Sequence, residues 1–204
     1  HIKRLIAIII SLAGCVIFAP ALLLIALLIK LDSPGPVLYL SRRMGRDGTP
    51  FAMLKFRSMY VNSPVRRNAD VSYRVDEQDS RVTRMGRFLR AGFDELPQLL
   101  NVLKGDMSLI GPRPDPLDAL PFYHPGDAAR LRVRPGITGL AQISGRTHIP
   151  WRERVAHDLA YVEHWSLWLD VQIAFFTIFE FIPSLSQWLV KMDHVQLARP
   201  RGAP

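Results

Sequence analysis

The uncharged, overwhelmingly apolar run from Leu5 to Ile29 is the feature that most constrains how this chain folds. A helix over this run is longer than the roughly 20 apolar residues that cross the hydrocarbon core of a bilayer. A removable secretory leader has a shorter apolar region, whereas this run continues well past Cys15. The sequence therefore predicts a membrane helix at residues 1–31, a folded domain at residues 32–190 and a disordered tail at residues 191–204.

Pro20 interrupts the apolar run and leaves two membrane paths open. A proline inside a helix removes a backbone hydrogen bond and kinks the helix. Basic residues flank the run on both sides, with Lys3 and Arg4 before it and Lys30 after it, whereas a spanning helix normally shows asymmetric flanks. Equal flanks favour a re-entrant helix whose two ends face the cytoplasm. A tilted single span that accommodates Pro20 stays open as well.

The net charge indicates the kind of partner. The chain carries a formal charge of +8, mostly from arginine, which suits bidentate contacts with phosphate groups. Such a charge points to nucleic acid, phosphorylated substrates or acidic lipids. Because the chain also has a membrane helix, we expect phospholipids and phosphorylated substrates and no nucleic acid. The single cysteine excludes an intrachain disulfide and a thiolate metal site.

Asp94 and Glu95 form the candidate catalytic pair. Asp94 lies where the N-cap of a leucine-faced helix would lie, and that helix would end at Lys104 and Gly105. The pair alone is explained by helix capping, but a helix start also favours a phosphate group. Aspartate is a known covalent nucleophile towards phosphoryl groups. Mg²⁺ often binds one or two carboxylates together with phosphate oxygens, so the pair is also a candidate metal site.

Arginines on both sides of this pair are candidate phosphate ligands. Arg113 lies between two prolines with fixed φ, which stiffens its backbone and would bring it back towards the carboxylates, although an ordinary extended loop is the alternative. Four further arginines recur every third residue and would share one face of a helix. Arg90 is the member nearest to Asp94 in the sequence, and the others would be solvated or rest on lipid headgroups. The set is Arg81, Arg84, Arg87 and Arg90.

A β-hairpin is predicted around Asp47 and Gly48, a dipeptide that favours tight turns. Its strands would cover residues 37–43 and 51–57. Alternation along the second strand places Lys55 and Arg57 on one face, where both would point at an anion. A solvated basic face is the alternative.

The later part of the chain holds a glycine-punctuated loop and two helices. The loop at residues 134–146 gives only a weak hint of nucleotide binding, because it lacks the known nucleotide fingerprints. Helices are predicted from Trp151 to Glu163 and after Ser166. The aromatic residues of the second helix suit a membrane interface, with a buried core helix as the alternative.

Several of these motifs, in this order, resemble the bacterial sugar transferases, the monotopic phosphoglycosyl transferases. The resemblance covers nearly the whole chain, from about Lys3 to Phe181. It is carried by Lys3-Arg4, Asp32-Ser33-Pro34-Gly35-Pro36, Lys55-Phe56-Arg57-Ser58-Met59, Asp94-Glu95-Leu96-Pro97-Gln98-Leu99, residues 101–114, residues 134–146 and Tyr161-Val162-Glu163.

The resemblance implies a fold and a reaction. The fold is mostly α with a small β-hairpin, in a monotopic membrane protein with a re-entrant helix broken at Pro20 and with interfacial amphipathic helices. The reaction transfers a sugar 1-phosphate from a UDP-sugar to undecaprenyl phosphate at the cytoplasmic face of the bacterial inner membrane, as the first membrane step of a glycoconjugate pathway. An oligomer is compatible with this family.

The resemblance also implies residue roles. Asp94 is the nucleophile that forms a phosphosugar-enzyme and releases UMP, and Mg²⁺ binds beside Asp94 and Glu95. The implied phosphate-binding and nucleotide-binding residues are Arg113, Arg90, Lys55, Arg57, Arg134, Gln142 and Arg146. Two other readings of the residues remain open at this point. They are a membrane-bound phosphoesterase that uses Asp94 with water as acceptor, and a non-catalytic scaffold that binds anionic lipid.

Overall fold

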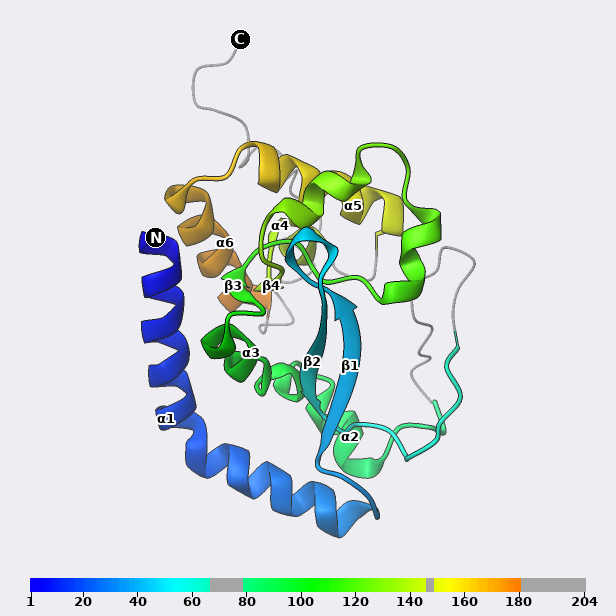
Figure 1. Cartoon of the computed structure of the whole chain (residues 1–204). Coiled ribbons are helices and arrows are strands. Elements are labelled where there is room, and N and C mark those ends of the chain that lie inside the picture. Colours follow the sequence, from blue (N-terminus) through cyan, green and yellow to red (C-terminus); the bar gives the residue numbers. More distant parts are fainter. Residues whose placement is uncertain (67–78, 146–148, 181–204) are drawn as a thin grey trace. The chain divides into compact units, whose positions relative to one another are not determined.

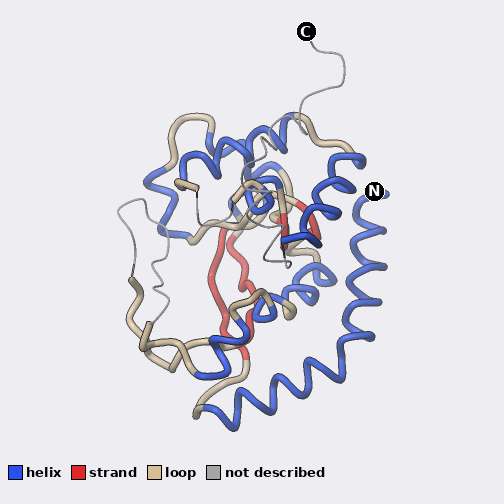
Figure 2. Tube along the Cα trace, turned by 180° about the vertical axis from the view of Figure 1, so that it is seen from behind, coloured by secondary structure: helices blue, strands red, loops and turns tan. Residues whose placement is uncertain are grey.

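The computed structural model describes residues 1–66, 79–145 and 149–180, and the chain is mostly helical with two small two-stranded sheets (Figure 2). This confirms the predicted mostly α fold with a β-hairpin. Two compact units make up the chain, His1–Arg42 with Ala52–Gly105, and Arg43–Phe51 with Asp106–Pro204. The predicted disordered tail at residues 191–204 lies outside the described residues.

Helix α1 (Ile2–Asp32) dominates the first unit, and Pro20 lies inside it. The helix is continuous but changes direction along its length (Figure 1), as expected where a proline removes a backbone hydrogen bond. It is long and apolar enough to cross a membrane, and only 11% of its most apolar stretch is buried. An exposed apolar helix of this kind is suited to membrane association. The re-entrant path stays a prediction.

Helices α2 (Arg84–Leu89) and α3 (Gln98–Lys104) both pack against α1. In the first half of α1 the approach to α3 is close, since a Cβ atom at Gly14 would lie 3.2 Å from the Leu99 side chain. Arg4 donates hydrogen bonds to the carbonyl oxygens of Val102 and Leu103 at the end of α3. The last carbonyls of a helix lack their usual donors, and Arg4 acts as a cap here together with the Gly105 amide, which also donates to Val102.

Arg57 secures the other end of α1. Its guanidinium donates to the carbonyl oxygens of Ser33 at 2.7 Å, Ile29 at 3.4 Å and Pro34. Gly35 has a φ of 123°, and a Cβ atom there would lie 2.4 Å from this guanidinium, so the turn after α1 needs glycine. Arg57 is only 5% exposed. The expectation that it points at an anion together with Lys55 is therefore corrected, because Arg57 is committed to the end of α1.

The predicted hairpin is present. Strand β1 (Leu38–Met44) pairs with β2 (Pro50–Phe56), and the turn η1 (Arg46–Gly48) connects them. Asp47 and Gly48 both have positive φ, at 55° and 76°, as tight hairpin turns require. The hairpin therefore begins and ends within one residue of the predicted bounds.

The second unit is built around a parallel strand pair that the sequence did not predict. β3 (Ser108–Ile110) lies beside β4 (Gly136–Thr138), and a Cβ atom at Gly136 would lie 2.2 Å from the backbone nitrogen of Gly111. A strand of three residues is too short to be recognised in the sequence from alternating polar and apolar side chains. Helices α4 (Leu140–Ile143), α5 (Trp151–Glu163) and α6 (Leu167–Glu180) belong to this unit, as do the 3₁₀ helices η3 (Leu117–Phe122) and η4 (Asp127–Arg132). Its core contains Ile110, Leu140, Ile143, Tyr161, Leu169 and Ile173.

The two predicted helices of this unit are confirmed. α5 has the predicted bounds, and the Ser166 hydroxyl accepts a hydrogen bond from the Leu169 amide at the start of α6. α6 has two apolar faces. One packs in the core through Leu169 and Ile173, and the other is exposed through Trp168, Val171, Phe175 and Ile178. An exposed apolar face suits the predicted membrane interface, and the placement of α6 there stays a prediction.

Replacing Arg57 with methionine should destabilise the protein, because the buried carbonyls at the end of α1 lose their charged donor. We expect the free energy of unfolding in detergent to fall by about 2 kcal/mol, measured by denaturant titration with circular dichroism. Arg46→Met is the matched control, since Arg46 is half exposed and forms an ion pair with the adjacent Asp47. Equal stability losses in the two variants would contradict the capping role.

Candidate active site

Asp94 and Glu95 lie in the 3₁₀ turn η2 (Phe93–Glu95), which follows Gly92. Helix α3 starts only at Gln98, with Pro97 at its N-cap position and no side-chain cap. The prediction that Asp94 caps this helix is therefore wrong. A capping side chain accepts from the N–H two or three residues further on, and Pro97 offers no N–H to Asp94 at the second of these positions. The predicted end of the helix is confirmed, because Gly105 follows with a φ of 101°.

Lys55 of β2 contacts both carboxylates. Its ammonium lies 2.7 Å from Glu95 Oε1 and 3.8 Å from Asp94 Oδ2. The three side chains keep between 15% and 20% of their surface exposed, so solvent screens their charges only in part. Because the ammonium is nearer to Glu95, it offsets the charge of Glu95 more strongly than that of Asp94.

Arg90 follows α2 and also interacts with this cluster. Partial burial lowers the pKa of its guanidinium, while the nearby charge of Asp94 opposes that shift. Arg81 does not join the predicted arginine stripe, because α2 begins at Arg84 and Arg81 is buried in an ion pair with Asp79. Arg90, which directly follows α2, is the stripe member whose guanidinium pKa is shown to respond to the charge of Asp94.

Asn101 is a site residue that sequence reasoning missed. It is 2% exposed, and its side-chain amide joins α3 to β2. Oδ1 accepts from the Leu54 amide at 2.9 Å, and Nδ2 donates to the Ala52 carbonyl at 2.8 Å. Lys55 follows Leu54 directly, so these two bonds determine where Lys55 leaves the strand relative to Glu95.

The signal for Asn101 was present in the sequence as a pair of amide residues three positions apart, Gln98 and Asn101. In the structure they form the buried face of α3 together with Val102. The leucines that were expected to form the apolar core face of this helix are only half-buried, and Leu100 is exposed.

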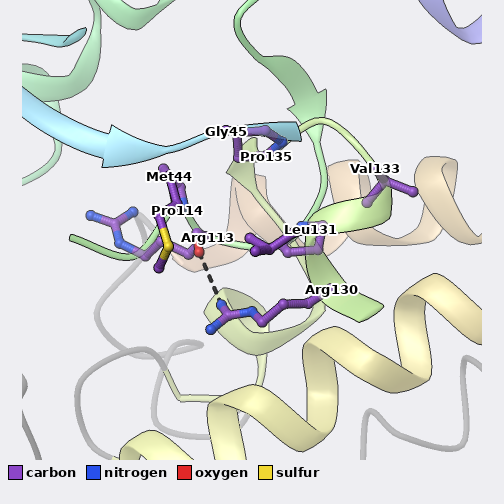
Figure 3. Close-up of a pocket in the computed structure, with 9 residues that line it drawn as sticks. Met44, Gly45, Arg113, Pro114, Arg130, Leu131, Val133 and Pro135 are labelled. Atoms are coloured by element: carbon purple, nitrogen blue, oxygen red, sulfur yellow. Dashed lines mark hydrogen bonds between the residues drawn. The ribbon is translucent and has the colours of Figure 1, made fainter. Parts of the chain in front are cut away.

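Arg113 belongs to the second unit and is half-buried after β3. Its carbonyl oxygen accepts a hydrogen bond from Arg130 Nη2 at 3.0 Å, and both residues line a small hollow (Figure 3). This hydrogen bond from Arg130 therefore holds the backbone of Arg113 in addition to the two flanking prolines. The other residues lining the hollow are Met44, Gly45, Pro112, Pro114, Leu131, Val133 and Pro135.

Arg130 is the second residue that sequence reasoning missed. It is 3% exposed and pairs with the carboxylates of Asp115 and Asp158. Burial alone would lower the pKa of Arg130, but these two carboxylates hold it above its ordinary value. Asp158 is completely buried, and burial raises its pKa to about 6 although Arg130 opposes the shift. No sequence pattern marks this cluster, because its members are far apart along the chain.

The predicted nucleotide loop is not a loop over most of its length, since it contains β4 and α4. Arg134 is half-buried just before β4. Gln142 is 4% exposed, and neither polar atom of its side chain has a hydrogen-bond partner in the part of the chain that the structure describes. Arg146 lies outside the described residues.

The structure therefore brings Lys55 to Asp94 and Glu95 and places Arg90 in the same unit, while Arg113, Arg134 and Gln142 belong to the other. The approach of Arg113 to the carboxylates stays a prediction. Within residues 1–66, 79–145 and 149–180, no group of three or more His, Cys, Asp or Glu side chains could hold a metal ion. Two carboxylates nonetheless fit the way Mg²⁺ binds when substrate phosphates supply further oxygens.

Comparison with known proteins identifies the family. The family model described as "Bacterial sugar transferase" matches residues 1–184. The chain belongs to the bacterial sugar transferase family. This confirms the resemblance carried by the sequence motifs and the expectation of a sugar-transferring enzyme.

The chain is similar to proteins named UDP-glucose:undecaprenyl-phosphate glucose-1-phosphate transferase. One, from Caulobacter vibrioides, is 46% identical over 86% of this chain and 68% of the relative. Another, from Escherichia coli K12, is 41% identical over 88% of this chain but only 40% of the relative. The exopolysaccharide production protein ExoY of Rhizobium meliloti is 42% identical over 86% of this chain and 83% of its own length. The chain thus spans about two-fifths of the longer relatives.

Asn101→Leu should weaken the link between Lys55 and Glu95, because the variant leaves the Leu54 amide and the Ala52 carbonyl without their partner. We expect the free energy of unfolding to fall by about 2 kcal/mol. A double-mutant cycle of Lys55→Met and Glu95→Gln should show a favourable coupling of about 1 kcal/mol that disappears in the Asn101→Leu background. Leu100→Ala, an exposed position on the same helix, is the control. An unchanged coupling would contradict the proposed link.

Asp158 should make stability depend on pH. Its pKa in the folded protein lies above the ordinary value, so the folded state binds the proton more tightly and the contribution of Asp158 falls as pH rises from about 4 to about 6. Asp158→Asn should therefore gain stability relative to the parent over this range, by at most about 1.4 kcal/mol per pH unit. Denaturant titrations between pH 4 and pH 7 measure this difference, with the exposed Asp118→Asn as charge control. A difference that stays constant with pH would contradict the shifted pKa.

Proposed function

We propose that this protein transfers a sugar 1-phosphate from a UDP-sugar to undecaprenyl phosphate, with release of UMP. The observation that carries the proposal is the adjacent pair of Asp94 and Glu95, contacted by the Lys55 ammonium, in the unit that also contains the apolar helix α1. The names of the Caulobacter and Escherichia relatives support this reaction and suggest UDP-glucose as the donor.

In the first step, a carboxylate oxygen of Asp94 attacks the phosphorus that bears the sugar. The bond from that phosphorus to the oxygen of UMP breaks, its electron pair leaves with UMP, and the sugar phosphate becomes an acyl phosphate on Asp94. Asp94 is the better nucleophile of the pair, because Lys55 lies nearer to Glu95. The charge of Arg90 offsets part of the repulsion between Asp94 and the incoming pyrophosphate.

In the second step, a phosphate oxygen of undecaprenyl phosphate attacks the same phosphorus. The bond between phosphorus and the Asp94 oxygen breaks, which restores the carboxylate and yields undecaprenyl diphosphosugar. A covalent intermediate allows the nucleotide product to leave before the lipid binds, so the soluble donor and the membrane acceptor need not occupy the site together.

We further propose that Asp94 and Glu95 hold Mg²⁺ with the substrate pyrophosphate. When bound, the ion would neutralise part of the charge on the phosphate oxygens. Arg113, Arg134, Gln142 and Arg146 remain predicted phosphate or nucleotide contacts. Arg57 is omitted, because it is bound to the end of α1.

A membrane location is consistent with this reaction. The phosphate of the acceptor lies at the headgroup plane while its isoprenoid chain stays in hydrocarbon. We propose that α1 enters the bacterial inner membrane from the cytoplasmic face as a re-entrant helix bent at Pro20, and that the exposed face of α6 lies among phospholipid headgroups.

Asp94→Asn should abolish turnover, because an amide cannot form the acyl phosphate. We expect UMP release to fall by more than about a thousandfold, as for other covalent nucleophiles. With radiolabelled UDP-glucose and no acceptor, the parent protein should retain label that undecaprenyl phosphate then removes, and the variant should retain none. Asp118→Asn, at an exposed position, should behave like the parent.

Two results would contradict this proposal. Normal turnover of Asp94→Asn would exclude Asp94 as nucleophile. Free sugar phosphate as the product in the presence of undecaprenyl phosphate would show a phosphoesterase that uses water as acceptor.

A further inference from the structure

Two exposed aromatic side chains are stacked beside Asp94. Phe88 of α2 and Phe93 of η2 have ring centroids 5.1 Å apart and an interplanar angle of 9°. Phe88 is 56% exposed and Phe93 is 41% exposed. Phe93 immediately precedes Asp94 in η2, so one ring of this aromatic pair lies in the same turn as the candidate nucleophile.

The pair lies on an element that also contacts the membrane helix. Leu89, which follows Phe88, is completely buried with Ile25 and Ile29 of α1. The Met85 amide of the same helix donates to Asp32 Oδ2 at the end of α1. One face of α2 is therefore held against the membrane helix, while Phe88 is presented outside the core of this unit.

The same helix presents positive charge. Arg84 and Arg87 are exposed on α2, and Arg90 follows it with its charge acting on Asp94. An apolar surface adjoining cations and the nucleophile is complementary to a ligand with an anionic head and an apolar tail. A nucleotide sugar has no apolar tail, whereas a polyprenyl phosphate has one.

We propose that the Phe88–Phe93 pair binds the first isoprene units of the polyprenyl phosphate acceptor, with the lipid phosphate directed towards Arg90 and Asp94. This inference rests on the proposed function and names the acceptor side of the same site. Isoprene units offer flat double bonds and methyl groups that pack on aromatic faces and leave water. Binding there places the reacting phosphate beside Asp94 while the rest of the chain continues into the membrane.

The two half-reactions separate this role from a structural one. We expect Phe88→Ala and Phe93→Ala to leave the rate of UMP release without acceptor within about twofold of the parent, and to raise KM for undecaprenyl phosphate about tenfold. Phe88→Tyr should restore KM, because it keeps the ring. Leu100→Ala removes an exposed apolar side chain from α3 and should change neither quantity.

Acceptor length gives a second readout. The parent should use undecaprenyl phosphate far better than a short-chain alkyl phosphate, and Phe88→Ala should reduce that preference. Thermal unfolding in the same detergent shows whether each variant keeps its fold. Binding of parent and variants to vesicles of phosphatidylglycerol and phosphatidylethanolamine shows whether the aromatic pair contacts the bilayer instead of the acceptor.

Three results would overturn the inference. They are an unchanged KM for undecaprenyl phosphate, an equal loss in both half-reactions, and loss of vesicle binding without a change of KM in detergent. If the parent itself releases no UMP from any UDP-sugar, the proposed function fails and this inference fails with it. If the parent transfers sugar phosphate and the variants keep its KM, only the inference fails.

Discussion

The double hydrogen bond from Asn101 to the backbone of β2 is the interaction on which the candidate active site depends. It joins the helix that follows the two carboxylates to the strand that carries Lys55. Because the Asn101 side chain is itself buried, these two partly buried bonds limit slippage between the two elements. The distance of 2.7 Å between Lys55 and Glu95 follows from this link as much as from the attraction of their charges.

The arginines of this chain serve several physical purposes. Arg4 and Arg57 satisfy the carbonyl groups at the ends of α3 and α1, where a helix leaves acceptors without partners. Arg130 lies between buried carboxylates and holds the backbone of Arg113. Because these arginines have structural partners, fewer arginines are available to an anionic substrate than the composition alone suggests.

Much of the local structure could be predicted because it depends on neighbours in the chain. The turn at Asp47 and Gly48, the helix end at Gly105 and the cap at Ser166 each follow from local backbone preferences. The predicted cap at Asp94 failed because Asp94 lies inside a 3₁₀ turn that starts after Gly92, and Pro97 offers its side chain no N–H to accept from. The parallel pair of β3 and β4 was not predicted either, since each three-residue strand is defined by its pairing with the other strand and not by a local sequence pattern.

The sequence by itself determined the apolar helix with its proline, the adjacent carboxylates and the membership of the family, because composition, spacing and motif order carry that information without a fold. Only the tertiary structure decided which cations join Asp94 and Glu95. It placed Lys55 and Arg90 with them and bound Arg57 to the end of a helix. The physical reason is that a charged side chain takes the partner its buried surroundings provide, and those surroundings come from segments far apart in the chain.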